Sequence, residues 1–83
     1  MSFYLYIIYS PSLDQYYVGQ THNLSDRLFR HKNSGSKSTQ KVSDWTLVFS
    51  EQYLTRSEAI LREKEIKRKK CRRYIEFLIN QSH

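Results

Sequence analysis

The apolar run FYLYIIY, residues 3–9, constrains the fold of this chain more than any other feature. Aromatic and β-branched side chains fill the run, which is typical of a β-strand that is buried or nearly so. The SPSLDQ segment that follows has turn chemistry and contains the only proline of the chain. YYVG, residues 16–19, predicts a second strand, and Gly19 is expected to let the backbone leave it. The two strands predict an antiparallel hairpin.

Helices and a third strand follow the hairpin. Asn23 is a suitable N-cap for a helix over about residues 24–33. WTLVFSEQY, residues 45–53, predicts the third strand, and TRSE after it has the pattern of a capping box that opens a second helix. The apolar face of this helix drifts, which places a break within residues 68–72 and a third short helix after it. The predicted order is ββαβαα, an α+β domain with a small three-stranded sheet.

The length of the chain predicts one small domain over residues 1–83. A chain this short buries only about 60% of its unfolded surface, so its core is modest. The single cysteine, Cys71, excludes an internal disulfide and a cysteine zinc cluster. The apolar start has no basic leader and is far shorter than the roughly 20 residues of a membrane span. We therefore expect a cytoplasmic protein without a membrane partner.

The whole net charge lies in one stretch, REKEIKRKKCRR, residues 62–73. This stretch holds eight basic and two acidic residues, net +6, while six basic residues cancel six acidic ones elsewhere. Such a concentration favours a polyanion as partner, nucleic acid ahead of an anionic membrane. The alternative is a solvated helix that keeps the protein soluble. A long loop at residues 32–44 adds lysines that can touch phosphate, among them Lys37 and Lys41.

Both predicted helices carry charged or titratable residues on the side of their apolar residues. At about 100° per residue, His31 lies within roughly 60° of the two leucines of the first helix, with Arg27 at the edge of that stripe. Glu63 lies inside the stripe of Ala59 and Ile66 on the second helix. A buried charge is costly unless it meets a partner or lines a wet cleft.

Arg27, His31 and Glu63 together suggest a site. They supply a cation for a phosphate, a titratable base near neutral pH and a hard oxygen ligand for Mg²⁺. The alternative is structural, with Glu63 paired to Arg27 or Lys67 as a buried ion pair. The tyrosine-rich hairpin beside these residues favours the functional interpretation.

Two short motifs resemble the paired signature of the GIY-YIG nucleases: YLY at residues 4–6 and YVG at residues 17–19. Arg27 follows ten residues after the second signature tyrosine, and SEAILREKEIK resembles the family's later helix with its glutamate. The resemblance covers nearly all of the chain and is closest to small stand-alone members. It implies a three-stranded antiparallel sheet flanked by helices and a metal-dependent endonuclease that hydrolyses DNA. RNA is a second candidate substrate, and DNA repair or processing is the implied setting.

The resemblance also implies a role for each matching residue. Arg27 binds the scissile phosphate, Glu63 ligates one divalent metal ion, Mg²⁺ or Mn²⁺, and His31 matches a family histidine. The general base is Tyr17 or His31, and the resemblance favours Tyr17. The expected catalytic residues are Tyr6, Tyr17, Arg27, His31 and Glu63.

The chain departs from the family pattern at a few positions. Tyr4 and Leu5 stand where the motif has Gly-Ile, Val18 replaces isoleucine, and Gln20 stands where repair-type relatives have lysine. The basic run is expected to guide the phosphate backbone, a contact that carries no base information. The residues expected to bind nucleic acid are Gly19, Lys37, Lys41, Lys67, Arg68, Lys69, Lys70, Arg72 and Arg73.

The sequence leaves two other functions open. One is a catalytically inactive nucleic-acid-binding module on the same fold, and the other is a basic helix that docks an acidic protein. We expect no small-molecule organic cofactor. We also expect the substrate specificity to be low or to be supplied by a targeting partner protein. Strand preference and oligomeric state have no signature in this sequence.

Overall fold

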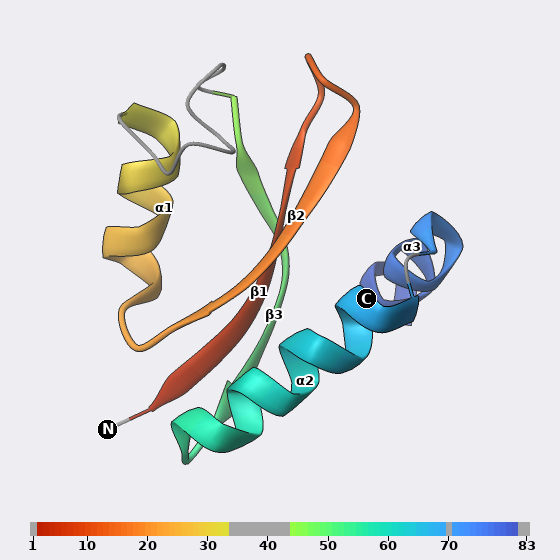
Figure 1. Ribbon diagram of the computed structural model, residues 1–83. Helices are drawn as coiled ribbons and strands as arrows, with labels where there is room; N and C mark the ends of the chain where they lie inside the picture. Colours follow the sequence, from red (N-terminus) through yellow and green to blue (C-terminus); the bar gives the residue numbers. More distant parts are fainter. Residues whose placement is uncertain (1, 34–43, 70, 82–83) are drawn as a thin grey trace.

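Strand β1, Phe3–Ser10, forms the centre of the sheet. In the computed structural model it lies between β2, Gln15–Thr21, and β3, Thr46–Tyr53, and pairs antiparallel with both (Figure 1). The four side chains at 5–8 are all buried, so both faces of β1 are covered. The predicted three-stranded sheet and α+β class are confirmed.

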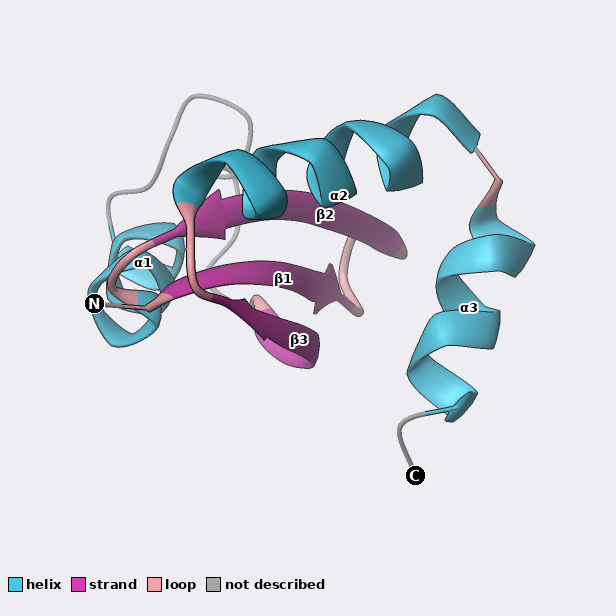
Figure 2. Ribbon diagram, turned by 90° about the horizontal axis from the view of Figure 1, so that it is seen from below, coloured by secondary structure: helices cyan, strands magenta, loops and turns pink. Residues whose placement is uncertain are grey.

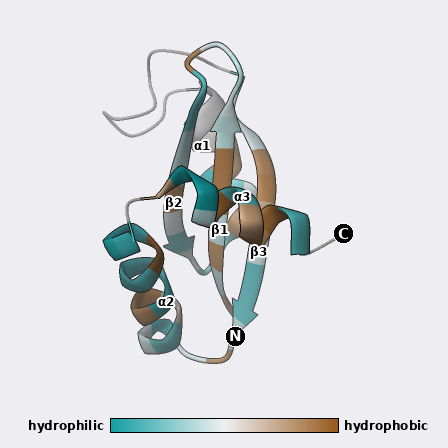
Figure 3. Cartoon of the chain, turned by 90° about the vertical axis from the view of Figure 1, so that its right-hand side faces the viewer, coloured by the Kyte–Doolittle hydropathy of each residue, from teal (hydrophilic) through white to brown (hydrophobic). Residues whose placement is uncertain are grey.

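Three helices cover the two faces of this sheet. Helix α1, Leu24–Asn33, lies on one face, and α2, Arg56–Lys69, and α3, Arg72–Gln81, lie on the other (Figures 1 and 2). Figure 3 looks onto the face that α2 and α3 cover, with α1 behind the sheet. The structure describes residues 2–33, 44–69 and 71–81, with side chains undescribed at 30–33.

Each face of the sheet has its own apolar core. The core under α1 is built on Tyr6, Ile8 and Trp45, with Leu24 and Leu28 of α1 packed against it. The predicted docking of this helix through its two leucines is therefore confirmed. The residues buried in the core under α2 and α3 are Leu5, Ile7, Val18, Ile66 and Leu78.

Local sequence signals set the ends of the helices. The side-chain oxygen of Asn23 accepts a hydrogen bond from the N–H of Asp26 at 3.0 Å, as an N-cap does. Thr55 accepts from the N–H of Glu58 at 3.3 Å and donates its hydroxyl to the Glu58 carboxylate at 3.0 Å. Helix α2 ends at Lys69 and α3 begins at Arg72, so the predicted helix break is confirmed.

Asp44 ties the β1–β2 turn to the start of β3. Its carboxylate accepts hydrogen bonds from the Ser12 hydroxyl at 2.6 Å, the Ser12 N–H at 2.9 Å and the Ser10 hydroxyl at 2.7 Å. The hydrogen bonds from Ser12 and then Ser10 lower the pKa of Asp44 to about 2. The charged form of Asp44 therefore stabilises this end of the sheet.

We expect an Asp44→Asn variant to be less stable than wild type near neutral pH and equally stable near pH 2. The pKa of Asp44 is about 2 in the folded state and about 3.9 in an unfolded chain. Its stabilising contribution is therefore complete above about pH 4 and is lost as the pH falls through about 2. Urea unfolding of both proteins across this range, followed by circular dichroism, measures the difference. A difference that does not depend on pH would contradict the role of the charge.

Candidate functional site

The tyrosines Tyr6 and Tyr17 lie on the face of the sheet that α1 covers. The strand register pairs Tyr6 with Gly19 and Ile8 with Tyr17. Because directly opposed residues of an antiparallel pair share a face, the two tyrosines are diagonal neighbours. Their ring centroids are 6.5 Å apart. The hairpin thus brings the two halves of the predicted signature together.

Gly19 leaves room for the ring of Tyr6. A Cβ atom on Gly19 would lie 2.5 Å from the Tyr6 hydroxyl oxygen and 2.7 Å from its Cζ. Tyr6 is only 1% exposed, so its ring has little space to retreat. The prediction that the backbone leaves the strand at Gly19 is wrong, because β2 continues to Thr21. The glycine is needed because the tyrosine ring lies directly against its backbone.

The Tyr6 hydroxyl lies within electrostatic range of three other candidate residues. Burial raises the pKa of Tyr6 well above its ordinary value of 10.0, and the neighbouring Tyr17 raises it further. The Arg27 guanidinium lowers this pKa, and the Glu63 carboxylate raises it. Side chains from β2, α1 and α2 thus all contribute to the electrostatic environment of this β1 tyrosine. Tyr6 therefore stays protonated at neutral pH and can donate a hydrogen bond.

Lys67 connects Glu63 to Tyr17. Its ammonium nitrogen lies 2.7 Å from a Glu63 carboxylate oxygen, one helical turn away on α2, and 5.9 Å from the centroid of the Tyr17 ring. The cation over the ring face is a favourable contact. The Glu63–Lys67 ion pair, which the sequence offered as a structural alternative, is thus present, and it lies beside Tyr17.

Glu63 suits a divalent ion whose other ligands are water and phosphate. Its side chain is 21% exposed, so an ion from solvent can reach the carboxylate. Among the described residues no group of three or more His, Cys, Asp or Glu side chains could hold a metal. Mg²⁺ is often bound through one or two carboxylates together with substrate phosphates, so one glutamate fits this use.

Helix α1 presents Arg27 toward the same site. The N-cap residue Asn23 starts this helix, and its carbonyl accepts the N–H of Arg27 at 3.1 Å. The Arg27 side chain is partly buried, as expected for the edge of the apolar stripe. The backbone of His31 belongs to α1, one turn further on, whereas its side chain lies outside the described residues.

Apart from Gly19 in β2, the expected nucleic-acid contacts are basic residues and divide into three groups. Lys67, Arg68, Lys69 and Arg73 are exposed around the end of α2 and the start of α3. Arg72 is also exposed but holds the Asp14 carboxylate, with its Nη2 2.6 Å from Oδ1. Lys37, Lys41 and Lys70 lie outside the described residues, as does most of the loop at residues 32–44.

Sequence reasoning missed the contact between the hairpin turn and α3. Asp14, at the turn, has a φ of 52°, and its carboxylate accepts hydrogen bonds from Arg72 and from the Tyr9 hydroxyl. These bonds, from Arg72 first and Tyr9 second, lower the pKa of Asp14 to about 2. The guanidinium of Arg72 also lies 5.3 Å from the centroid of the Tyr16 ring. Asp14 and Arg72 are 58 positions apart in the sequence, so no local pattern could have revealed their contact.

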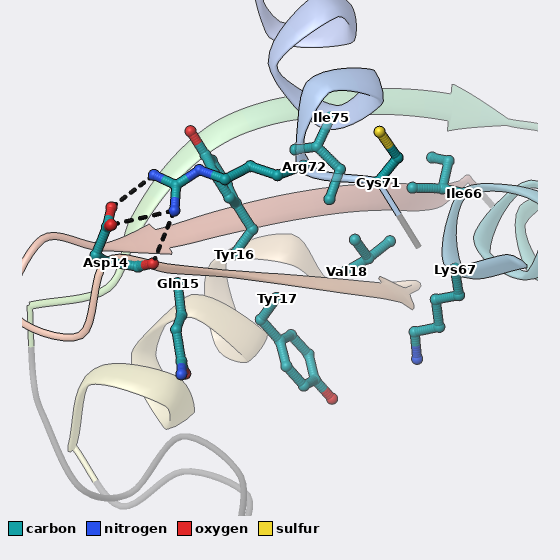
Figure 4. A pocket seen from close by; sticks show the side chains of 10 residues that line it. All are labelled: Asp14, Gln15, Tyr16, Tyr17, Val18, Ile66, Lys67, Cys71, Arg72 and Ile75. Carbon is teal, nitrogen blue, oxygen red and sulfur yellow. Dashed lines mark hydrogen bonds and ion pairs between the residues drawn. The ribbon is translucent and has the colours of Figure 1, made fainter. Parts of the chain in front are cut away.

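A pocket of about 440 Å³ lies between β2 and the junction of α2 with α3 (Figure 4). It extends from Asp14 and Arg72 at one end to Lys67 at the other, where it adjoins the candidate site. No sequence pattern indicated this pocket, because its walls come from three separate elements. In the described part of the chain, no helix is long and apolar enough to cross a membrane.

Comparison with known proteins agrees with this geometry. The family model described as the GIY-YIG catalytic domain matches residues 2–75. The solution NMR structure of the UPF0213 protein BH0048 from Bacillus halodurans is similar, with 28% sequence identity and a TM-score of 0.62. The similarity covers 98% of this chain and 85% of that one. No curated protein matches the chain. The chain therefore belongs to the GIY-YIG family of nuclease-type domains.

Proposed function

We propose that this protein is a metal-dependent endonuclease that hydrolyses phosphodiester bonds in DNA. One observation supports this most strongly: Arg27 and Glu63, from helices on opposite faces of the sheet, both act on the buried Tyr6 hydroxyl. A cation and a carboxylate whose charges both reach the Tyr6–Tyr17 pair are the groups that phosphodiester hydrolysis needs. The family supports a nucleic acid as substrate.

Arg27 binds the scissile phosphate in this proposal. Its guanidinium is planar and always charged, and it offers paired N–H donors that match two phosphate oxygens. Negative charge grows on these oxygens as the attacking water approaches. Because the guanidinium is held by α1 before the substrate binds, it stabilises that charge without reorganising.

Glu63 holds one Mg²⁺ or Mn²⁺ ion in this proposal. When bound, such an ion supplies Lewis-acid stabilisation of the phosphate and the leaving oxygen. The neighbouring ammonium of Lys67, 2.7 Å away, keeps the Glu63 carboxylate directed toward Tyr17 and the site. Glu63 and Arg27 thus approach the phosphate from two directions.

In this proposal the two tyrosines help to remove the proton of the attacking water. Tyr6 keeps its proton because burial raises its pKa, so it acts as a positioning group beside Tyr17. Tyr17 is partly exposed and, as its phenolate, is our first candidate to accept the proton, with the neutral imidazole of His31 as the second. The exposed cations at the end of α2 and the start of α3 guide the phosphate backbone toward these groups.

The test is cleavage of end-labelled single-stranded and double-stranded DNA with Mg²⁺, with Mn²⁺ and with a chelator. We expect cleavage with either metal and none with the chelator. An Arg27→Lys variant keeps the charge but loses the fork of donors, so its cleavage rate should fall about 10²-fold. Arg68→Lys is the matched control, since this exposed residue needs only its charge, and its rate should stay near that of wild type.

Three results would count against the proposal. DNA binding without any cleavage under all metal conditions would favour an inactive binding module. A lack of DNA binding would favour a basic helix that docks an acidic protein. An equal loss of rate in the Arg27 and Arg68 variants would remove the special role of Arg27.

A further inference from the structure

The pocket beside the candidate site has the size and lining of a small-ligand site. Its volume of about 440 Å³ lies within the range of about 300–1,000 Å³ typical of such sites. Val18 from β2, Ile66 from α2 and Ile75 from α3 form an apolar floor. Tyr16 and Tyr17 of β2 also line it, with Tyr16 on the same side of the strand as Val18 and the Tyr17 ring on the opposite side (Figure 4). Such a surface suits a ligand with a flat, largely apolar group.

Positive charge surrounds this apolar floor. Lys67 and Arg72 line the pocket, each paired with a carboxylate. Arg68, Lys69 and Arg73, which are close to them in the sequence, are exposed and add the excess positive charge. The one carboxylate in the lining, Asp14, is neutralised by Arg72. A ligand that combines a flat apolar group with a phosphate matches both the apolar floor and the positive charge around it.

The pocket is continuous with the candidate site. Tyr17 and Lys67 line it, and Lys67 is also the partner of the Glu63 carboxylate. Because Tyr17 and Lys67 belong to both, a strand whose scissile phosphate lies at Glu63 can place a neighbouring nucleotide at this pocket. The neighbouring nucleotide of that strand is the group best placed to enter it.

We infer that this pocket binds one unpaired nucleotide of the substrate strand, next to the phosphate that is cut. Its base lies on the floor of Val18, Ile66 and Ile75, and its phosphate lies at the Lys67 end, where the pocket adjoins the candidate site. A base inside a duplex is stacked and paired, so it enters such a pocket only when unpaired. The inference rests on the proposed nuclease function and adds a preference for single-stranded or locally unpaired substrate.

Cys71 provides a direct probe of this pocket. It is the only cysteine of the chain, it is exposed, and it lines the pocket. The experiment follows alkylation of Cys71 in the wild-type protein by iodoacetamide at mildly alkaline pH, with chelator present so that no DNA is cut. The added probes are oligothymidylate, an abasic oligomer of equal length and charge, and a blunt duplex.

We expect oligothymidylate to protect Cys71 from alkylation. The abasic oligomer should need a concentration about five- to hundredfold higher for the same protection, the range that contact with one stacked base supplies. The duplex should bind without protecting. Equal protection by oligothymidylate and the abasic oligomer would overturn the inference, because it would show that phosphate contacts alone cover the thiol. Equal protection by the duplex would overturn the preference for an unpaired base.

A Cys71→Trp variant gives an independent measurement. The new side chain starts at an exposed position and fills the pocket, so oligothymidylate binding should weaken about tenfold while duplex binding stays unchanged. Cys71→Ala, which leaves the pocket open, is the matched control and should bind as wild type does. Unchanged oligothymidylate binding by the tryptophan variant would contradict the inference. Because binding is measured without metal, failure of the nuclease assay and failure of the pocket are separate results.

Discussion

A Glu63→Gln variant is expected to lose metal-dependent cleavage by about 10³-fold or more while keeping its fold and its affinity for DNA. A bound metal contributes several kcal/mol to stabilising the transition state, and each 1.36 kcal/mol is tenfold in rate. Glutamine has the shape of glutamate but lacks the charge that holds a hard divalent ion. Cleavage of labelled DNA over a range of Mg²⁺ and Mn²⁺ concentrations measures the loss.

Glu65→Gln is the matched control for this experiment. Glu65 lies two positions along α2, and its carboxylate pairs with Arg62 rather than with Lys67. The same change there should leave the cleavage rate within a small factor of wild type. If the two variants lose activity equally, Glu63 serves the stability of α2 and not the chemistry. Circular dichroism of both variants confirms that the helix is intact.

A Gly19→Ala variant is expected to lose about 1–3 kcal/mol of stability, together with most of its activity. The added methyl group would lie 2.5 Å from the Tyr6 hydroxyl oxygen and 2.7 Å from Cζ, both closer than non-bonded atoms approach. Tyr6 is buried beside Ile8 and Trp45, so relief requires the strands to shift. A shift of Tyr6 also moves the hydroxyl that Tyr17, Arg27 and Glu63 surround. Urea unfolding and cleavage rates measure the two effects.

A double-mutant cycle with Tyr6→Phe isolates the clash. Removing the Tyr6 hydroxyl removes the atom nearest the new methyl group, so Gly19→Ala should cost less stability in the Tyr6→Phe background. The Cζ contact remains, so the relief is partial. Equal costs of Gly19→Ala in both backgrounds would show that the glycine acts through its own backbone and not through Tyr6.

Local features of the fold were predictable from the sequence. The N-caps at Asn23 and Thr55 form the expected hydrogen bonds, because the partner groups lie only three residues along the chain. The strand at residues 3–9 is buried because its aromatic and β-branched side chains have no polar face to expose. The break between α2 and α3 also followed from the drift of the apolar face. Each of these features depends on neighbours within one or two turns.

The candidate site was predictable in its members but not in its arrangement. Helical spacing placed Arg27 and Glu63 on the inner sides of their helices, and the family resemblance supplied the tyrosines. The spacing allowed the Glu63–Lys67 pair within α2. It could not show that Lys67 lies over the Tyr17 ring, because that contact depends on how α2 crosses β2. The sequence also predicted the wrong role for Gly19, because the space that the Tyr6 ring needs is set by the pairing of β1 with β2.

The amino-acid sequence alone was enough to predict the elements, their order, the concentration of positive charge and the candidate residues for the chemistry. Periodicity, capping and composition act over a few residues, so they can be read along the chain. Three features are visible only in the folded chain: Tyr6 lies against Gly19, Arg72 holds Asp14, and a pocket adjoins the site. These contacts join segments far apart in the chain, and the register of the sheet and the packing of helices on it set their geometry.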